Sequence, residues 1–314
     1  MKDMDVKRLF LISFLIGSLI FEAMGEANLP KECGISKTHG LQGCTPKTSR
    51  IIERVEAVNG EIPWQASLDV SNGWQYFTTC GAVVVSSQYL LTAAHCLKYK
   101  DEGVMWEAIA KFSTIKVGDT HMFIGNEIYN ISSFFIHPNY TILEDENKTI
   151  YKNDIALVQL TSNISFNDNV TAICLPESKF TVCGSENVVI SGWGLTEEHN
   201  ETDDHYISFP FNLQRANIQT IAKNDSRCIK SNNGTEIDDT VFCTDSRPKG
   251  SYPGDMGGPV SIEHSGKCVL AGLISNEEYR EKDFQSGLNV NIVHFLEWIY
   301  ETIRTTARDG VSPS

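Results

Sequence analysis

Basic residues, metal-binding histidine patterns and long apolar segments are all scarce in this 314-residue sequence. Lys and Arg number 26 against 40 Asp and Glu, which gives a formal net charge of −14. Such a chain repels phosphate groups, so nucleic acid and anionic membranes are disfavoured as partners. None of the eight histidines stands in an H-x-x-x-H or H-E pattern. We therefore expect no metal site and no cofactor.

The N-terminus predicts a secretory signal peptide. Basic residues precede the apolar run LFLISFLIGSLIF at 9–21, and the small residues Ala23 and Gly25 follow it. This order is typical of a signal covering residues 1–25. The alternative is a membrane anchor, but the run is shorter than the ~20 residues that span a bilayer. No other stretch is long and apolar enough to span, and nine cysteines suit an oxidising compartment, so we expect a secreted, extracellular protein.

The sequence is dense in N-glycosylation sequons, which are tolerated only on surface loops. Glycans there would confer solubility and protease resistance, or take part in recognition. The sequon asparagines are Asn130, Asn139, Asn147, Asn163, Asn169, Asn200, Asn224 and Asn233.

Short apolar runs broken by Gly, Asn, Pro and Asp continue from residue 51 to about 305. Strands at this spacing predict an all-β sandwich or a pair of barrels. The last element differs, because its apolar residues recur at helical spacing and Asn291 could cap its N-terminus. The residues on that helical face are Ile292, Phe295, Leu296, Ile299 and Ile303.

Three motifs carry the chemistry. LTAAHC places His95 at the end of one strand, KNDIALVQL places Asp154 at the start of another, and GDMGGP at 254–259 forms a glycine turn. In this order they resemble the trypsin-like (S1) serine proteases. PWQASL, AICLP, SGWG and the closing helix with Trp298 extend the resemblance over residues 51 to about 303.

The resemblance implies two packed six-stranded antiparallel β-barrels with a C-terminal helix and a site in the cleft between them. His95 would be the general base, and Asp154 would orient it. The backbone N–H groups of Gly254 and Met256 would form the oxyanion hole.

The resemblance also divides the chain. Residues 1–25 would be the signal, 26–50 a propeptide or light-chain segment, 51–305 the peptidase-like domain and 306–314 a tail. Cleavage between Arg50 and Ile51 would free an amino group that pairs with Asp255. The glycines that let this terminus swing inward are replaced by Glu53 and Arg54, which puts the insertion in doubt.

The residue at the nucleophile position is Met256, where the family has serine. A thioether has no proton to give and cannot form an acyl ester. Loss of a triad member leaves only about 10³–10⁴-fold acceleration over water. The sequence therefore predicts a protein that keeps the protease fold but cannot cleave peptide bonds.

The specificity pocket differs from the family as well. Gly250 stands where trypsin has its pocket aspartate, and Ser251 lies at the base of the pocket. Glu277 replaces a glycine of the pocket wall and would crowd the entrance. The pocket positions are Gly250, Ser251, Ser275, Asn276, Glu277 and Gly287.

By family analogy, the expected disulfides are Cys80–Cys96, Cys228–Cys243 and Cys33–Cys174. Cys183 and Cys268 sit at no standard family position, and we expect them to pair with each other. Because nine is odd, Cys44 would remain free or link to another chain.

Three readings follow for function. The first is a secreted, inactive protease homologue that acts by protein binding, as a decoy, a cofactor or a regulator of proteolysis. Its partner would be a substrate-like protein, a protease or a protease inhibitor. The second is a working serine endopeptidase that another residue rescues. The third is a glycosylated structural or carrier protein.

Overall fold

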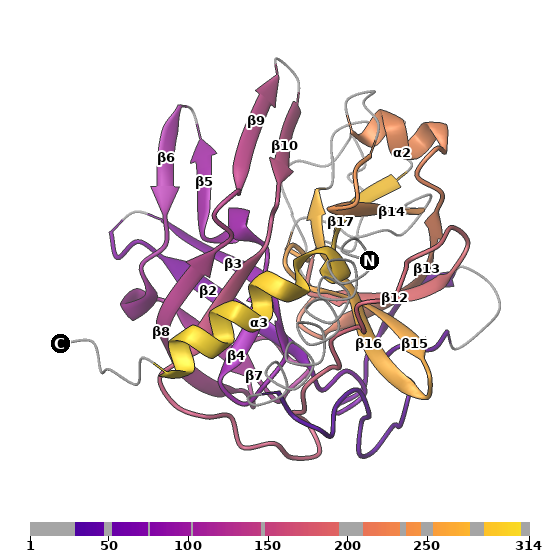
Figure 1. Ribbon diagram of the computed structural model, residues 1–314. Helices are drawn as coiled ribbons and strands as arrows, with labels where there is room; N and C mark the ends of the chain where they lie inside the picture. Colours follow the sequence, from indigo (N-terminus) through magenta and orange to yellow (C-terminus); the bar gives the residue numbers. More distant parts are fainter. Residues whose placement is uncertain are drawn as a thin grey trace, which may run out of the picture.

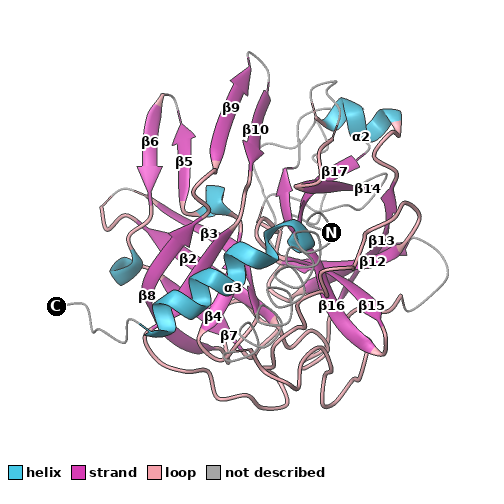
Figure 2. Cartoon of the chain, in the orientation of Figure 1, coloured by secondary structure: helices cyan, strands magenta, loops and turns pink. Residues whose placement is uncertain are grey.

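The computed structural model describes residues 29–46, 52–74, 76–101, 103–145, 148–194, 210–232, 237–245, 254–276 and 286–308. The chain forms two six-stranded antiparallel β-barrels, one beside the other, and ends in a helix (Figure 1). Figure 2 shows how strongly strands dominate over helices. The fold expected from the sequence is confirmed.

The first barrel closes in the order β11-β4-β3-β2-β7-β8. Its strands are β2 (Gln65–Ser71), β3 (Phe77–Val84), β4 (Tyr89–Thr92), β7 (Thr114–Val117), β8 (Glu127–Ile136) and β11 (Ala156–Leu160). Along β2, the fully buried apolar residues Ala66, Leu68 and Val70 alternate with the polar residues Gln65, Ser67, Asp69 and Ser71. This period of two is what a strand with one face inside a barrel requires.

The second barrel closes where β13 pairs with β14, and β1 adds to the outside of β13. Its six strands are β12 (Asn187–Gly192), β13 (Gln214–Ile221), β14 (Val241–Asp245), β15 (Pro259–His264), β16 (Lys267–Asn276) and β17 (Ser286–Asn291), and the added strand β1 covers Ile52–Glu56. The remaining elements are the ribbons β5 (Lys98–Asp101) with β6 (Val104–Glu107) and β9 (Thr141–Asp145) with β10 (Lys148–Lys152), the 3-10 turns η2 (Ala94–Cys96) and η3 (Ala110–Phe112), and the helices α2 (Ser226–Ser231) and α3 (Ile292–Arg308).

Helix α3 leaves the second barrel and lies across the first (Figure 1). The five apolar residues predicted for its inner face are at most 5% exposed and join the core of the first barrel. The Tyr89 hydroxyl lies 2.8 Å from the Thr306 hydroxyl and ties the helix end to β4. The predicted cap is wrong: Asn291 donates its amide to the Asp239 carbonyl, and its side-chain oxygen accepts no hydrogen bond within the described residues.

The cysteine pairing corrects one expectation. Cys33–Cys174, Cys80–Cys96 and Cys228–Cys243 are present. However, Cys268 pairs with Cys44, so the expected Cys183–Cys268 bridge is wrong and Cys44 is neither free nor available to another chain. Cys183 is the free cysteine, and it is exposed. Two disulfides therefore link residues 29–46 to the rest of the protein.

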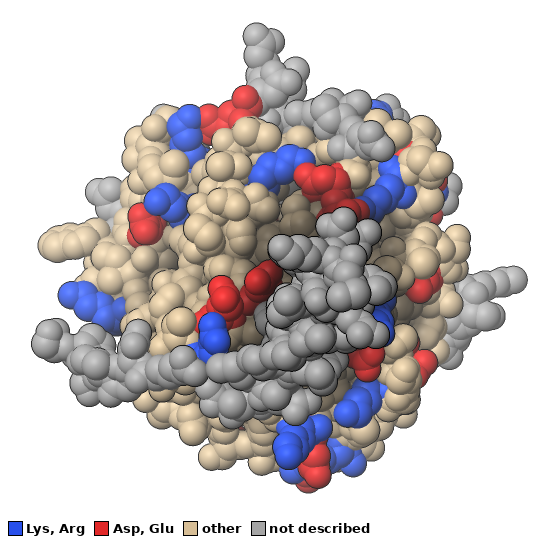
Figure 3. All heavy atoms as spheres, viewed as in Figure 1, with Lys and Arg blue, Asp and Glu red and all other residues tan. Residues whose placement is uncertain are grey.

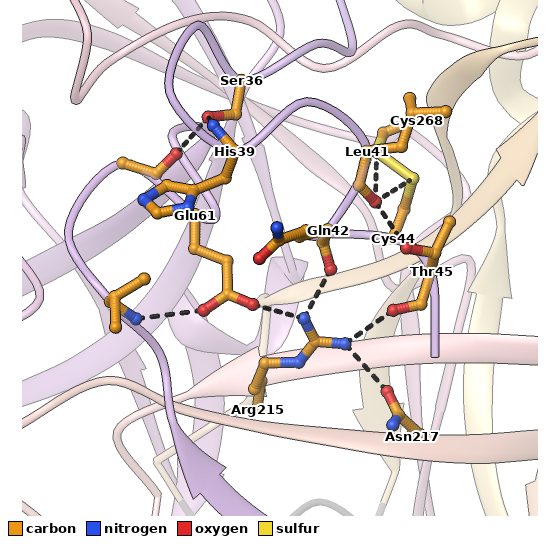
Figure 4. Close-up of polar contacts among 12 residues, drawn as sticks. Ser36, His39, Leu41, Gln42, Cys44, Thr45, Glu61, Arg215, Asn217 and Cys268 are labelled. Carbon is orange, nitrogen blue, oxygen red and sulfur yellow. Dashed lines mark hydrogen bonds and ion pairs between the residues drawn. A yellow bond between two sulfur atoms is a disulfide. The ribbon is translucent and has the colours of Figure 1, made fainter. Parts of the chain in front are cut away.

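A buried arginine holds the same N-terminal segment from below (Figure 4). Arg215 on β13 donates to the carbonyl oxygens of Gln42 and Thr45, and it forms an ion pair with Glu61 at 2.6 Å. Its Nη2 also reaches the Asn217 side chain at 2.9 Å. The segment is therefore fixed by a charged network as well as by sulfur.

The surface carries exposed sequons and dispersed charge. On the face in Figure 3, acidic and basic side chains are interspersed in small groups. Asn147, Asn200 and Asn233 lie outside the described residues. The other sequon asparagines are all exposed, as a glycan would need, and they are Asn130, Asn139, Asn163, Asn169 and Asn224.

Neither a membrane-spanning helix nor a metal-binding cluster occurs in the part of the chain that the structure describes. Among the described residues, no helix has the length and apolar character to cross a membrane. The same part of the chain contains no group of three His, Cys, Asp or Glu side chains placed to hold a metal ion.

Candidate active site

His95 and Asp154 meet at the side of the first barrel that faces the second. His95 sits in the turn η2 directly after β4, and Asp154 lies just before β11, which pairs with β4. The His95 ring Nδ1 is 2.7 Å from one Asp154 oxygen, and the His95 backbone N–H donates to the other at 2.8 Å. The carboxylate thus orients both the ring and the backbone of the histidine.

Ser275 adds a third contact to Asp154 from the second barrel. Its hydroxyl on β16 donates to Asp154 at 2.5 Å. Burial by itself raises the pKa of Asp154, but the nearby His95 and the hydrogen bonds from His95 and Ser275 outweigh it. The pKa of this carboxyl therefore lies below its ordinary value, and Asp154 is ionised at neutral pH.

Tyr151 on β10 covers one face of His95. The two rings stack with their centroids 4.5 Å apart and their planes 11° from parallel. Burial, and then the negative charge of Asp154, raise the pKa of Tyr151 to about 12, so the hydroxyl stays neutral. No sequence motif predicts this contact.

The glycine turn comes from the second barrel and touches the first. Gly81 on β3 donates its N–H to the Met256 carbonyl at 2.7 Å. The Met256 side chain is half-buried against the Cys80–Cys96 disulfide region. Gly257 has φ +80°, and a Cβ there would lie 2.4 Å from the Gly81 carbonyl oxygen. Only glycine fits this close approach of the two barrels.

The turn contains the two expected oxyanion donors, the backbone N–H groups of Gly254 and Met256. Within the described ranges, neither the Gly254 nor the Met256 backbone N–H donates to a protein acceptor. Asp255, the residue between them, is buried and forms an ion pair with Arg54. Arg50 and Ile51, the expected activation positions, lie outside the described residues.

The structure places only part of the expected pocket. Ser275, which was expected in the pocket wall, belongs to β16, and its hydroxyl donates to Asp154. Asn276 pairs with Leu288 at the end of β16, and Gly287 is buried on β17 opposite Thr244. Gly250, Ser251 and Glu277 lie outside the described residues.

Replacing Asp154 with asparagine is expected to lower the free energy of unfolding by about 1–3 kcal/mol at pH 7. Because the folded pKa lies below the reference value of 3.8, this stability is present above that value and is lost as the pH falls through the folded pKa. The difference between native protein and Asp154→Asn should therefore shrink below about pH 4. Urea unfolding across pH checks it, with the exposed Asp168→Asn as control. A difference that grows in acid would contradict the assignment.

Comparison with known proteins agrees with this geometry. The family model described as Trypsin matches residues 51–299. Trypsin-1 of Astacus astacus is 28% identical over 79% of this chain and 98% of its own length. Transmembrane protease serine 11G of Rattus norvegicus is 28% identical over 88% of this chain, and Transmembrane protease serine 9 of the same organism is 29% identical over 90%.

The chain spans only 60% and 24% of those two transmembrane relatives. The disulfide-rich fold itself is typical of the extracellular space. With the family model covering most of the sequence and a double barrel that brings His95 and Asp154 together, the chain belongs to the Trypsin family of serine proteases and their homologues.

Proposed function

We propose that this protein is a secreted, non-catalytic member of the family that acts by binding another protein. One observation carries the proposal: residue 256 is methionine in an otherwise preserved frame. His95 and Asp154 are hydrogen bonded, and within the described residues the Gly254 and Met256 N–H groups donate to no protein acceptor. At the nucleophile position, Met256 offers no hydroxyl or thiol that could attack a carbonyl carbon.

The chemistry explains why the substitution is decisive. The base in this family takes a proton from the nucleophile, and a thioether carries none. The oxyanion donors alone leave about 10³–10⁴-fold acceleration over water. For a peptide bond, this rate is negligible on a biological timescale. The preserved frame is then a shaped surface between two barrels rather than a reaction centre.

Several features support a binding role outside the cell. The signal-like residues 1–25, which lie outside the described residues, favour secretion, as do four disulfides and exposed sequons. The partner we expect is a substrate-like protein, a protease or a protease inhibitor, since these are the proteins that fit a protease cleft. Nucleic acid and membrane surfaces are disfavoured by the net charge of −14.

The test compares the protein before and after limited trypsin cutting at Arg50. We expect no fluorophosphonate labelling and no hydrolysis of a mixed peptide library in either form, with cutting verified from the new N-terminus. Labelling of the native protein would support the competing reading, a working serine endopeptidase, which the intact His95–Asp154 pair favours. The labelled peptide would then identify the nucleophile.

Met256→Ser is expected to remain a poor peptidase, because Gly250 and Glu277 have changed the pocket that positions a substrate. Met105→Ser is the matched control, since Met105 is exposed on β6 away from the site. The measurement is hydrolysis of the same peptide library. Robust cleavage by Met256→Ser alone would show that the pocket still works and that one side chain separates this protein from an enzyme.

A further inference from the structure

The carboxylate of Asp255 has a cation beside it in the uncut chain. Its side chain is 1% exposed, and it forms an ion pair with Arg54, whose side chain is 8% exposed. The other Asp255 oxygen accepts the Gly194 N–H at 2.7 Å. A carboxylate this deeply buried needs a compensating charge and hydrogen bonds.

Arg54 is held in place to meet this need. It lies on β1, which pairs with β13 on both sides of it, at Ile52↔Asn217 and Val55↔Arg215. Its Nη1 donates to the Gly194 carbonyl at 3.3 Å, while Nη2 reaches Asp255. Arg54, Asp255 and Gly194 therefore form a closed ring of contacts, and the forked guanidinium suits two acceptors at once.

The space beside the Asp255 carboxylate is so narrow that only glycine fits at position 192. A Cβ at Gly192 would lie 2.1 Å from an Asp255 oxygen. Glycine at this position therefore lets the side chain enter the second barrel beside Gly194. Arg54 and Gly194 therefore bind the carboxylate and Gly192 leaves room for it, although all three are distant from Asp255 in the sequence.

We infer that Arg54 supplies, from within the uncut chain, the positive charge that the family resemblance assigns to the amino group freed at Ile51. Arg54 is then a positioning residue: it acts on the site through Asp255. A guanidinium stays charged at every physiological pH and needs no bond to be cut. The 254–258 turn thus takes its binding shape without processing at Arg50, whether or not the protein cleaves peptides.

The hydrogen bonds of the turn agree with this inference. The Gly258 N–H donates to the Asp255 carbonyl, and the Gly257 N–H donates to the Ile274 carbonyl, both at 2.8 Å. The Met256 carbonyl accepts from Gly81 across the barrel boundary. All three are present in the full-length chain, and the N–H groups of Gly257 and Gly258 can report on the turn.

Hydrogen–deuterium exchange of peptides covering 192–194 and 254–258 tests the inference. The full-length protein is measured uncut and after verified cutting at Arg50, alongside Arg54→Gln, Arg54→Lys and the control Arg304→Gln, which lies on α3 and pairs with Glu301. We expect native exchange rates to agree within about twofold before and after cutting. Arg54→Gln should speed exchange at least about tenfold in the uncut protein, and Arg54→Lys should partly restore protection.

Two results would overturn the inference. The first is a native turn that becomes at least tenfold more protected only after cutting, since the new amino group would then be the effective partner of Asp255. The second is an Arg54→Gln turn that exchanges like the native one. If Arg54→Gln does not fold, the comparison of cut and uncut native protein still decides, because it needs no variant.

Discussion

Replacing Arg215 with methionine is expected to lower the free energy of unfolding by about 3–5 kcal/mol. The change removes one member of a buried ion pair in which Arg215 is 1% and Glu61 0% exposed. Glu61 would then stay buried without its arginine, and the carbonyl oxygens of Gln42 and Thr45 would lose their donor. Desolvated polar groups left in this way account for most of the expected loss.

Urea unfolding of the purified protein measures the effect. Lys223→Met is the matched control, because Lys223 also belongs to an ion pair, with Asp239, but on an exposed surface, where such a pair contributes little. The double variant Arg215→Met with Glu61→Gln should recover part of the loss, since the unpaired charge is gone. A single variant as stable as the double would show that the ion pair is not what holds the N-terminal segment.

Removing the Cys44–Cys268 disulfide is expected to lower the free energy of unfolding by a similar amount. With Cys33–Cys174 still closed, the bridge encloses a loop of roughly 100 residues, for which loop-closure entropy gives about 4.7 kcal/mol. The double variant Cys44→Ser with Cys268→Ser avoids leaving a lone buried thiol. We expect a loss of about 3–5 kcal/mol, measured by urea unfolding.

Cys183→Ser provides the comparison, because Cys183 is exposed and free. Its stability should stay close to that of the native protein. A strong loss of stability in Cys183→Ser, with Cys44→Ser alone close to the native protein, would instead restore the pairing of Cys183 with Cys268 that the sequence alone suggested. Mass mapping of non-reduced peptides would check the same point independently.

The contrast between these cysteines shows where sequence reasoning ends. Cys80 and Cys96 lie beside a recognisable histidine motif, so their partnership could be read from position. Cys44 and Cys268 are 224 residues apart and lie in no motif. Their pairing depends on the path of residues 29–46 over the second barrel, which no local pattern encodes.

The residues of the candidate site likewise fall into those that a sequence motif predicts and those that it does not. His95, Asp154 and the glycine turn were predicted because each lies in a distinctive motif. Ser275 and Tyr151 were missed as neighbours of Asp154 and His95, since their contacts arise from separate strands of the fold. Arg54 was noted only as a departure from glycine, because its partner Asp255 lies 201 residues away.

Two of the disulfides have a consequence for covalent connectivity. Cys33–Cys174 and Cys44–Cys268 interleave along the sequence, because one end of each lies between the two ends of the other. If peptide bonds and disulfides are treated as the edges of a graph, cutting any single peptide bond between Cys33 and Cys268 leaves the graph connected. A nick in this span, at Arg50–Ile51 or in an exposed loop, therefore releases no fragment until the sulfurs are reduced.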